Sequence, residues 1–391
     1  RRHSLTSTDS RDIPGNIGSG KSKAAAVKQP EPVATGAVAA SARKDSLEPQ
    51  PTIPAPKTPP AAKSKPLSNG DFSLSPDPTA PPDSSGVQSR EAELWDPSTL
   101  CKAPVVDCSS VTHIGANSAM TGNPLKSENQ DVVSAIISWD GEEHYGMFTV
   151  FDGHGQDGLG CAQFCEQAME RRLKLSLGSS TPPQDALKSA FIAVQRELAA
   201  SERESKFSGA TASVALVAGN VLYFAHAGDS RGILVSTGTH NLATVENLGK
   251  DHRPDDAKEK GRIEMQGGRV VCKMDAAGNT IGPPRVYHAV DPFPGLMLSR
   301  SLGDTYAHSL GVSALPEITT VALQPTHKLL VVGSDGVWDV MSSQEVGDLV
   351  LGCGTAAEAC DLILQESLRR WQAKGSADNV GVVVAQLDLP I

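Results

Sequence analysis

The chain has 391 residues and a formal net charge of −10 at pH 7. No apolar run reaches the roughly 20 residues of a membrane-spanning helix, and the start RRHSLTSTDS lacks the apolar core of a signal peptide, so no membrane partner is expected. The acidic balance argues against nucleic acid as the main ligand. Seven cysteines without a C-x-x-C pair indicate a reducing, intracellular compartment, cytoplasmic or nuclear.

The first 90 residues differ in composition from the rest of the chain. They hold 14 of the 27 prolines but one of the 16 aromatic residues, Phe72. Such a segment cannot bury enough apolar surface to offset the entropy of ordering its backbone, about 1 to 2 kcal/mol per residue. Residues 1–90 are therefore predicted to be a disordered tail rich in Pro, Ser and Ala, and residues 91–391 to be folded.

Two kinds of short pattern occur in this tail. GNIGSGKS, Gly15–Ser22, fits the phosphate-binding loop G-x-x-x-x-G-K-S, but no strand precedes it and prolines soon follow. A chance match is favoured over a nucleotide-binding protein, although both interpretations stay open. Ser4 after two arginines, Thr58-Pro59 and Ser75-Pro76 are candidate kinase sites.

After the tail, apolar runs alternate with helical periodicities. In chain order, the pattern predicts a hairpin from 131–139 and 143–153, helices at 159–175 and 184–204, a three-stranded meander over 211–236, a helix at 255–266, a strand at 328–333, a helix at 355–375 and a strand at 379–387. Cys161 and Cys165, one helical turn apart, are interpreted as packing residues. Strands in consecutive runs with helices inserted in pairs favour an antiparallel α+β architecture.

Acidic residues stand at the ends of these predicted strands. Asp152 and Asp335 follow apolar runs, Asp378 precedes one, and Asp131 and Asp229 occupy similar places. Each alone also fits a turn, because Asp-Gly and Asp-Asn are common turn pairs. Together they point to one rim of a sheet, where carboxylate oxygens converge on Mg²⁺ or Mn²⁺.

Seven short blocks in order carry a resemblance to a known family. KSENQD, FDGHG, GATASVAL, AGDSR, LSRSLGD, VGSDGVWD and ADNVGVV resemble the signature blocks of the metal-dependent type 2C serine/threonine protein phosphatases, from about residue 110 to 388. The resemblance implies a four-layer α-β-β-α sandwich, in which two antiparallel sheets are flanked by helices. It also implies that residues 91–391 form a phosphatase catalytic domain.

The resemblance further implies a metal centre of two Mg²⁺ or Mn²⁺ ions. Asp152 would bridge the two ions, Asp335 and Asp378 would complete one, and the Gly153 carbonyl would serve the other. Gln130 and Asp131 would act through coordinated water, and Asp229 and Asp339 would form a weaker third site. Gln130 stands where other members carry Glu, which lowers the negative charge near one metal.

The expected reaction is hydrolysis of phosphoserine and phosphothreonine on proteins by a water activated between the two ions. Phosphate monoesters hydrolyse very slowly uncatalysed, so the nucleophile has to be generated at neutral pH. His154 matches the family's general acid for the leaving alkoxide. Lys126 stands where the family commonly has Arg to hold the phosphate, and it lacks the bidentate fork.

Other features bear on substrates and on the rival hypothesis. The block LSRSLGD is expected to be a structural turn near the site, and residues 255–294 resemble the variable flap beside the cleft. Phosphoprotein substrates and a monomer are expected. The alternative to an active phosphatase is a binding module of the same fold that has lost catalysis. The presence of Asp152, Asp335 and Asp378 argues against this alternative.

Overall fold

The computed structural model describes residues 100–113, 128–138, 143–238, 240, 242–275 and 277–390. Several sequence predictions lie outside these residues. They are the disordered tail over 1–90, the pattern Gly15–Ser22, the three candidate kinase sites and Lys126. No helix among the described residues is both long and apolar enough to cross a membrane.

Two antiparallel sheets pack face to face. The first has the order β1 (Val105–His113), β15 (Val380–Leu387), β14 (His327–Gly333), β7 (Arg231–Thr237), β8 (Ala243–Asn247). The second has the order β12 (Leu302–Gly303), β4 (Gly209–Ala210), β3 (Tyr145–His154), β5 (Ala212–Ala218), β6 (Val221–Ala227), β13 (Glu317–Ala322), with β2 (Asp131–Ile136) paired to β3. Their inner faces enclose a core that includes Phe148, Phe224 and Val383, each fully buried.

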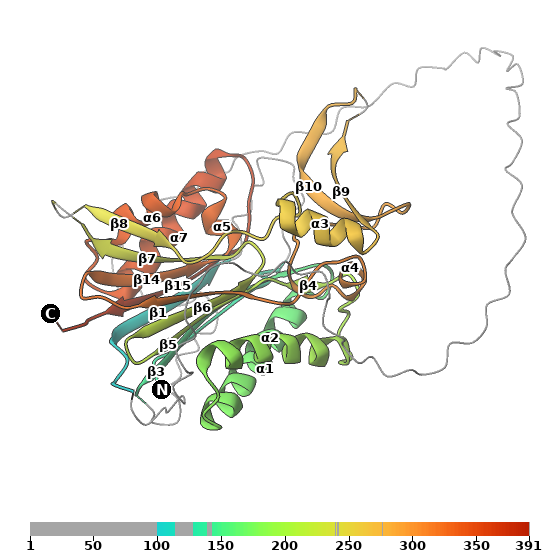
Figure 1. Cartoon of the computed structure of the whole chain (residues 1–391). Coiled ribbons are helices and arrows are strands. Elements are labelled where there is room, and N and C mark those ends of the chain that lie inside the picture. The colour runs from blue at the N-terminus through green and yellow to red at the C-terminus, as the bar shows by residue number, and fades with distance from the viewer. Residues whose placement is uncertain are drawn as a thin grey trace, which may run out of the picture. The chain divides into compact units, whose positions relative to one another are not determined.

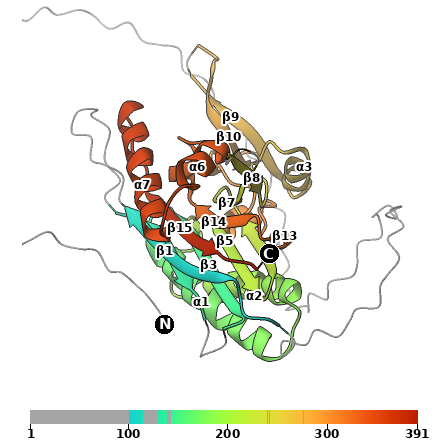
Figure 2. The same ribbon diagram turned by 90° about the vertical axis from the view of Figure 1, so that its left-hand side faces the viewer.

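Helices cover both outer faces, which confirms the predicted four-layer sandwich (Figure 1, Figure 2). Helices α1 (Gly158–Gly178) and α2 (Pro183–Ala199) pack on the second sheet, and α6 (Ser343–Val350) and α7 (Ala356–Ala373) pack on the first. Since each sheet is buried on both faces, β5 and β14 are almost continuously apolar rather than alternating. Cys161 and Cys165 are fully buried on α1, as their interpretation as packing residues requires.

Two details of the sequence prediction are wrong. The predicted meander over 211–236 is not one sheet, because β5 pairs with β6 whereas β7 pairs with β14 and β8 in the other sheet. The chain crosses between the sheets at the turn Gly228–Ser230, where Gly228 has φ +124°. The helix predicted to reach Glu204 ends at Ala199, since no apolar residue continues its buried face and the Ser201 hydroxyl donates to the Leu198 carbonyl oxygen, 2.7 Å.

A smaller unit lies beside one end of the sandwich and corresponds to the predicted flap (Figure 1). It comprises α3 (Ala257–Met265) and a three-stranded sheet of β9 (Gly268–Met274), β10 (Thr280–His288) and β11 (Pro294–Leu296). Its small core joins Ile263 and Val286 to Ala307 of the short helix α4 (Thr305–His308). Buried Glu259 fixes α3 to the chain that follows the flap, because it accepts hydrogen bonds from Arg262 and Arg300.

Candidate active site

A pocket of about 430 Å³ lies where the two sheets end and the flap begins. The sandwich side supplies seven of the ten site residues predicted from the sequence: Gln130, Asp152, Gly153, His154, Asp229, Asp335 and Asp378. The facing wall is formed by Arg285 and residues 294–298 of the flap. Residues that lie up to 248 positions apart in the chain therefore share one cavity.

The hairpin of β2 and β3 positions the first group of these residues. Asp131 lies opposite Asp152 in the ladder. The Asp152 amide donates to the Thr211 hydroxyl, 3.1 Å, and the Thr211 amide donates to the Asp152 carbonyl oxygen, 2.9 Å. Thr211 also shares a 2.7 Å hydrogen bond with Ser230, beside Asp229. The blocks GATASVAL and AGDSR thus hold the strand end that carries Asp152.

Gly153 lies in a space that admits no side chain. A Cβ atom there would overlap the carbonyl oxygen of Gly158 and come within 2.8 Å of that of Gln130. The Gly153 amide donates to the same Gln130 oxygen, 3.1 Å. This close approach lets the start of α1 pack directly on the end of β3. It explains why glycine follows Asp152.

Strands β14 and β15 bring Asp335 and Asp378 together, because they are antiparallel neighbours and the two residues flank adjacent strand ends. Ser334 fixes this edge: its amide donates to the Gly381 carbonyl oxygen, 2.9 Å, and its hydroxyl donates to Asp131 Oδ2, 2.7 Å. Asn379 Oδ1 accepts from the Gln130 amide, 3.1 Å, which ties the block ADNVGVV to KSENQD.

The pocket concentrates negative charge. Burial, followed by the charges of Asp152, Asp229 and Asp378, raises the pKa of Asp335 well above its usual value. Burial is also the main cause that raises the pKa of Asp229 to about 6, although Arg253 opposes the rise. Such shifts mean that ionising these carboxyl groups costs free energy, first through lost hydration and then through their mutual repulsion. A cation bound among them would relieve this repulsion.

The oxygen donors fit hydrated divalent cations. No three acidic, histidine or cysteine side chains in the described parts of the chain converge closely enough to enclose an ion by themselves. Mg²⁺ usually keeps several waters and is held by one or two carboxylates, so such a centre does not require a closed protein cage. The residues that would hold the ions are Asp152, Asp335, Asp378 and the Gly153 carbonyl, all at the pocket wall.

His154 and Asp304 form a pair at the edge of the pocket. His154 Nε2 lies 2.7 Å from Asp304 Oδ2, which also accepts a hydrogen bond from the Ser301 hydroxyl, 2.6 Å. Burial alone would raise the pKa of Asp304, but the charge and hydrogen bond of His154 and the bond from Ser301 lower it overall. An ionised Asp304 stabilises the imidazolium form of His154, the form that a general acid requires.

Asp304 and Arg285 are site residues that the sequence reasoning missed. The block LSRSLGD does form a turn near the site, as predicted, but its aspartate also contacts His154 directly. Arg285 is half-buried on β10. Among the described residues its side chain makes one hydrogen bond, from Nη1 to the Gly295 carbonyl oxygen, 2.7 Å, and no ion pair. The only signal for Asp304 was its place in a recognised block, and Arg285 had none.

Two further predicted site residues, Asp131 and Asp339, are described by the structure and lie outside the pocket lining. Asp131 is buried behind Asp152 with its carboxylate on Ser334. Asp339 follows α5 (Asp335–Trp338), is exposed, and has Oδ1 3.8 Å from Arg253 Nη2. That guanidinium also contacts Asp251. Asp339 raises the pKa of Asp229, so the two carboxylates influence each other across this arginine.

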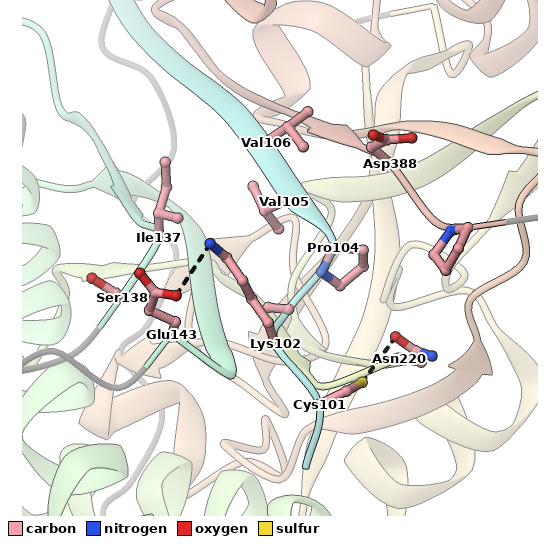
Figure 3. Close-up of a pocket in the computed structure, with 12 residues that line it drawn as sticks. Cys101, Lys102, Pro104, Val105, Val106, Ile137, Ser138, Glu143, Asn220 and Asp388 are labelled. Atoms are coloured by element: carbon pink, nitrogen blue, oxygen red, sulfur yellow. Dashed lines mark hydrogen bonds and ion pairs between the residues drawn. The ribbon is translucent and has the colours of Figure 1, made fainter.

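A larger pocket, of about 620 Å³, lies at the opposite strand ends (Figure 3). Its lining includes Lys102, whose Nζ lies 3.1 Å from a carboxylate oxygen of Glu143. Cys101 Sγ donates to Asn220 Oδ1, 3.1 Å. The ion pair and this bond use most of the polar groups there, and Asp388 is the other acidic residue of the lining. Size alone therefore does not identify the active site.

Comparisons with known proteins agree with this geometry. The family model described as "Protein phosphatase 2C" matches residues 116–380. Probable protein phosphatase 2C 35 of Arabidopsis thaliana is 32% identical over 275 residues, which are 66% of this chain and 79% of that protein. Probable protein phosphatase 2C 64 of Oryza sativa subsp. japonica is 33% identical over 277 residues, 67% of this chain and 63% of that one.

A solved structure supports the fold independently. The serine-threonine phosphatase 2C from Toxoplasma gondii superimposes with a TM-score of 0.61 at 21% identity, over 74% of this chain and 97% of that one. At this identity the likeness concerns the fold, and the family assignment rests on the sequence matches. The chain therefore belongs to the protein phosphatase 2C family of serine/threonine protein phosphatases.

Proposed function

We propose that the chain is an active, metal-dependent phosphatase that hydrolyses phosphoserine and phosphothreonine on proteins. The observation that carries this proposal is the convergence of Asp152, Gly153, Asp335 and Asp378 in one pocket with His154. A module that had lost catalysis would not be expected to keep this set. When bound, two Mg²⁺ or Mn²⁺ ions supply an activated water and neutralise charge on the phosphoryl group.

The chain's own residues contribute the remaining chemistry. His154 donates a proton to the alkoxide of serine or threonine as the phosphorus–oxygen bond breaks, and Asp304 holds its imidazole in place. Arg285 provides guanidinium N–H donors on the flap wall for the phosphoryl oxygens. Lys126, which lies outside the described residues, is proposed to bind the phosphate as a second cation. Asp131 and Gln130 are proposed to orient water, and Asp229 and Asp339 to bind a third ion weakly.

We also propose that the protein is intracellular, in the cytoplasm or nucleus, because its seven cysteines are all free thiols. It is proposed to act as a monomer without nucleic-acid or membrane partners. The location and the lack of nucleic-acid and membrane partners rest on the composition of the chain. Its substrates are phosphoproteins, whose phosphorylated side chains have to enter a pocket of about 430 Å³.

The test uses the full chain and a phosphoserine peptide with Mn²⁺, with Mg²⁺ and after chelation. We expect phosphate release that depends on the metal. Asp335→Asn should lower kcat by about 10² to 10⁴-fold, the range seen when one catalytic group is removed. The matched control is Asp361→Asn, because Asp361 is exposed on α7. It should retain wild-type turnover.

A second readout does not depend on turnover. A ligand that binds only the folded state at a hundred times its Kd stabilises that state by about 2.7 kcal/mol. Mn²⁺ should therefore raise the Tm of the wild type and of Asp361→Asn. It should raise the Tm of Asp335→Asn much less. Wild-type protein that gains Tm with Mn²⁺ yet releases no phosphate would be a binding module. Turnover that survives chelation would refute the metal assignment.

A further inference from the structure

Exposed aromatic side chains gather at the mouth of the pocket. Phe207 and Phe293 are 44% and 58% exposed, and no other Phe, Tyr or Trp in the described segments is exposed. The Phe207 ring lies 6.4 Å from that of Phe293 and 5.3 Å from that of Tyr306, between ring centroids. The three residues come from the loop before β4, the chain before β11 and helix α4. We name them the aromatic ledge.

The ledge is continuous with the pocket. Phe207 itself lines the cavity that holds Asp152 and His154, and so does Pro294, the residue after Phe293. Near the ledge, Gly209 of β4 pairs with His154 of β3 in the ladder. A peptide whose phosphorylated side chain reaches His154 therefore passes close to Phe207.

Backbone hydrogen bonds hold Phe207 and Tyr306 of the ledge in a fixed position. The Asp304 amide donates to the Ser208 carbonyl oxygen, 2.9 Å, and the Tyr306 amide donates to that of Lys206, 3.2 Å. These bonds join the loop that carries Phe207 to the turn that carries Asp304. Phe207, Tyr306 and the His154–Asp304 pair are thus parts of one framework. A fixed surface binds an apolar group with little loss of conformational entropy.

The size of the cavity determines which part of a substrate meets the ledge. A pocket of about 430 Å³ suits one phosphorylated side chain, and the neighbouring residues of a protein substrate have to lie along its rim. More than half of the exposed large apolar side chains in the described residues belong to the flap region between Met265 and Met297. Of these, Met297 lines the pocket and Phe293 belongs to the ledge. Exposed apolar side chains that adjoin a polar site are typical of a binding surface.

The positive charge of Lys206 near the ledge limits which substrate side chains can bind there. Lys206 is exposed, and its Nζ lies 5.2 Å from the ring centroid of Phe207 and 5.9 Å from that of Tyr306. This ammonium group repels a basic side chain. It leaves the exposed surface of Phe293 available to an apolar one.

We propose that the aromatic ledge binds a large apolar side chain next to the phosphorylated residue and so selects among phosphoprotein substrates. This inference rests on the proposed function, because it concerns the same pocket. Aromatic pairs contribute about 0.5 to 1.5 kcal/mol, and tenfold in rate corresponds to about 1.4 kcal/mol. The expected preference in kcat/KM is therefore about twofold to tenfold.

The test compares phosphoserine peptides that differ at one position within three residues of the phosphoserine, which carries Phe, Ser or Lys. The full chain with Mn²⁺ should cleave the Phe peptide fastest and the Lys peptide slowest at one or more positions. Phe293→Ser should bring the kcat/KM ratio of the Phe peptide to the Ser peptide close to one, and Phe207→Ser should do the same. Leu175→Ser, which alters an exposed apolar residue on α1, should leave the ratio unchanged.

The ratio of kcat/KM for the Phe and Ser peptides distinguishes a loss of substrate selection from a damaged fold. A disturbed fold lowers kcat/KM for every peptide by the same factor and leaves the ratio unchanged. Equal cleavage of the Phe and Ser peptides by the wild type at all positions would refute the proposed binding role of the ledge and leave the proposed function intact. A preference that persists unchanged in both ledge variants would also overturn it. Failure of the wild type to cleave any peptide would refute the proposed function and, with it, the ledge.

Discussion

At the scale of single residues, the contact between His154 and Asp304 makes a sharp prediction. Asp304→Asn keeps a residue that tolerates the observed φ of +43°, but removes the charge that stabilises the imidazolium of His154. We expect kcat for a phosphoserine peptide to fall by about 10 to 10²-fold with little change in KM. The alkaline limb of the kcat profile should move to lower pH.

The flap offers a matched control for this substitution. His288 and Asp291 also form a histidine–aspartate pair, with Nδ1 and Oδ2 3.0 Å apart, but Asp291 is 53% exposed at its side chain and outside the pocket lining. Asp291→Asn should leave kcat and its pH profile as in the wild type. Equal kcat for the wild type and Asp304→Asn would mean that Asp304 only stabilises the turn.

The residues found from the sequence and those missed differ in their local signal. Asp152, Asp335 and Asp378 flank apolar strands, so hydropathy and turn chemistry are enough to single them out. Arg285 lies between prolines and apolar residues of the flap without a motif around it, and its place opposite the carboxylates depends on how β10 folds over the sandwich. That placement is a tertiary property, and a single sequence does not encode it in a short pattern.

At the scale of elements, the junction of α5 and β15 tolerates no added atom. A Cβ at Gly336 would overlap the carbonyl oxygen of Asn379, and Trp371 donates to the Gly336 carbonyl oxygen, 2.7 Å. Gly336→Ala should lower the free energy of unfolding by about 1 to 3 kcal/mol, as overpacking does. It should also lower activity, because Asn379 binds the Gln130 amide. Urea unfolding and phosphate release measure the two effects.

Helix α3 supplies the control for that substitution. A Cβ at Gly261 meets nothing within 4 Å. Gly261→Ala should therefore raise the free energy of unfolding by up to about 1 kcal/mol, since alanine favours a helix over glycine. If Gly336→Ala unfolds at the same urea concentration as the wild type, the junction is looser than the structure implies.

Strand pairing was the element property that the sequence could not supply. The apolar residues of β7 would suit either sheet, so periodicity predicted the strand but not its partners. The partner is decided by the turn at Gly228, where a Cβ would lie 2.7 Å from Thr211. By crossing between the sheets there, the chain places Asp229 in the pocket. The wrong prediction of a meander thus concerned a part of the fold that builds the site.

At the scale of the whole molecule, His252 connects several parts of the fold. Its Nδ1 accepts from the Gly228 amide, 3.2 Å, its carbonyl oxygen accepts from the Ser299 amide, 3.0 Å, and its Nε2 lies 3.4 Å from Glu317 on β13. Its ring stacks on that of His226 at 4.4 Å. Burial first, and then the charges of His226 and Arg300, lower the pKa of His252 to about 3.

This shift predicts the sign of a pH dependence. The unfolded chain binds a proton at His252 below about pH 6.5, whereas the folded chain does so only near pH 3, so folding loses stability as the pH falls through 6.5. Between pH 7.5 and 5 the loss from this group is about 2 kcal/mol. Asp229 and Asp335 act in the opposite direction without metal, because their pKa values are raised in the folded state.

A difference measurement isolates the contribution of His252. The free energy of unfolding in urea is measured for metal-free wild type and His252→Gln at pH 7.5 and at pH 5. The carboxylates are common to both proteins, so their contribution cancels in the difference between wild type and variant. Glutamine does not titrate, so the stability advantage of the wild type over the variant should shrink by about 2 kcal/mol on acidification. The same advantage at both pH values would show that His252 is not held neutral by its surroundings, and that the sandwich opens there to water.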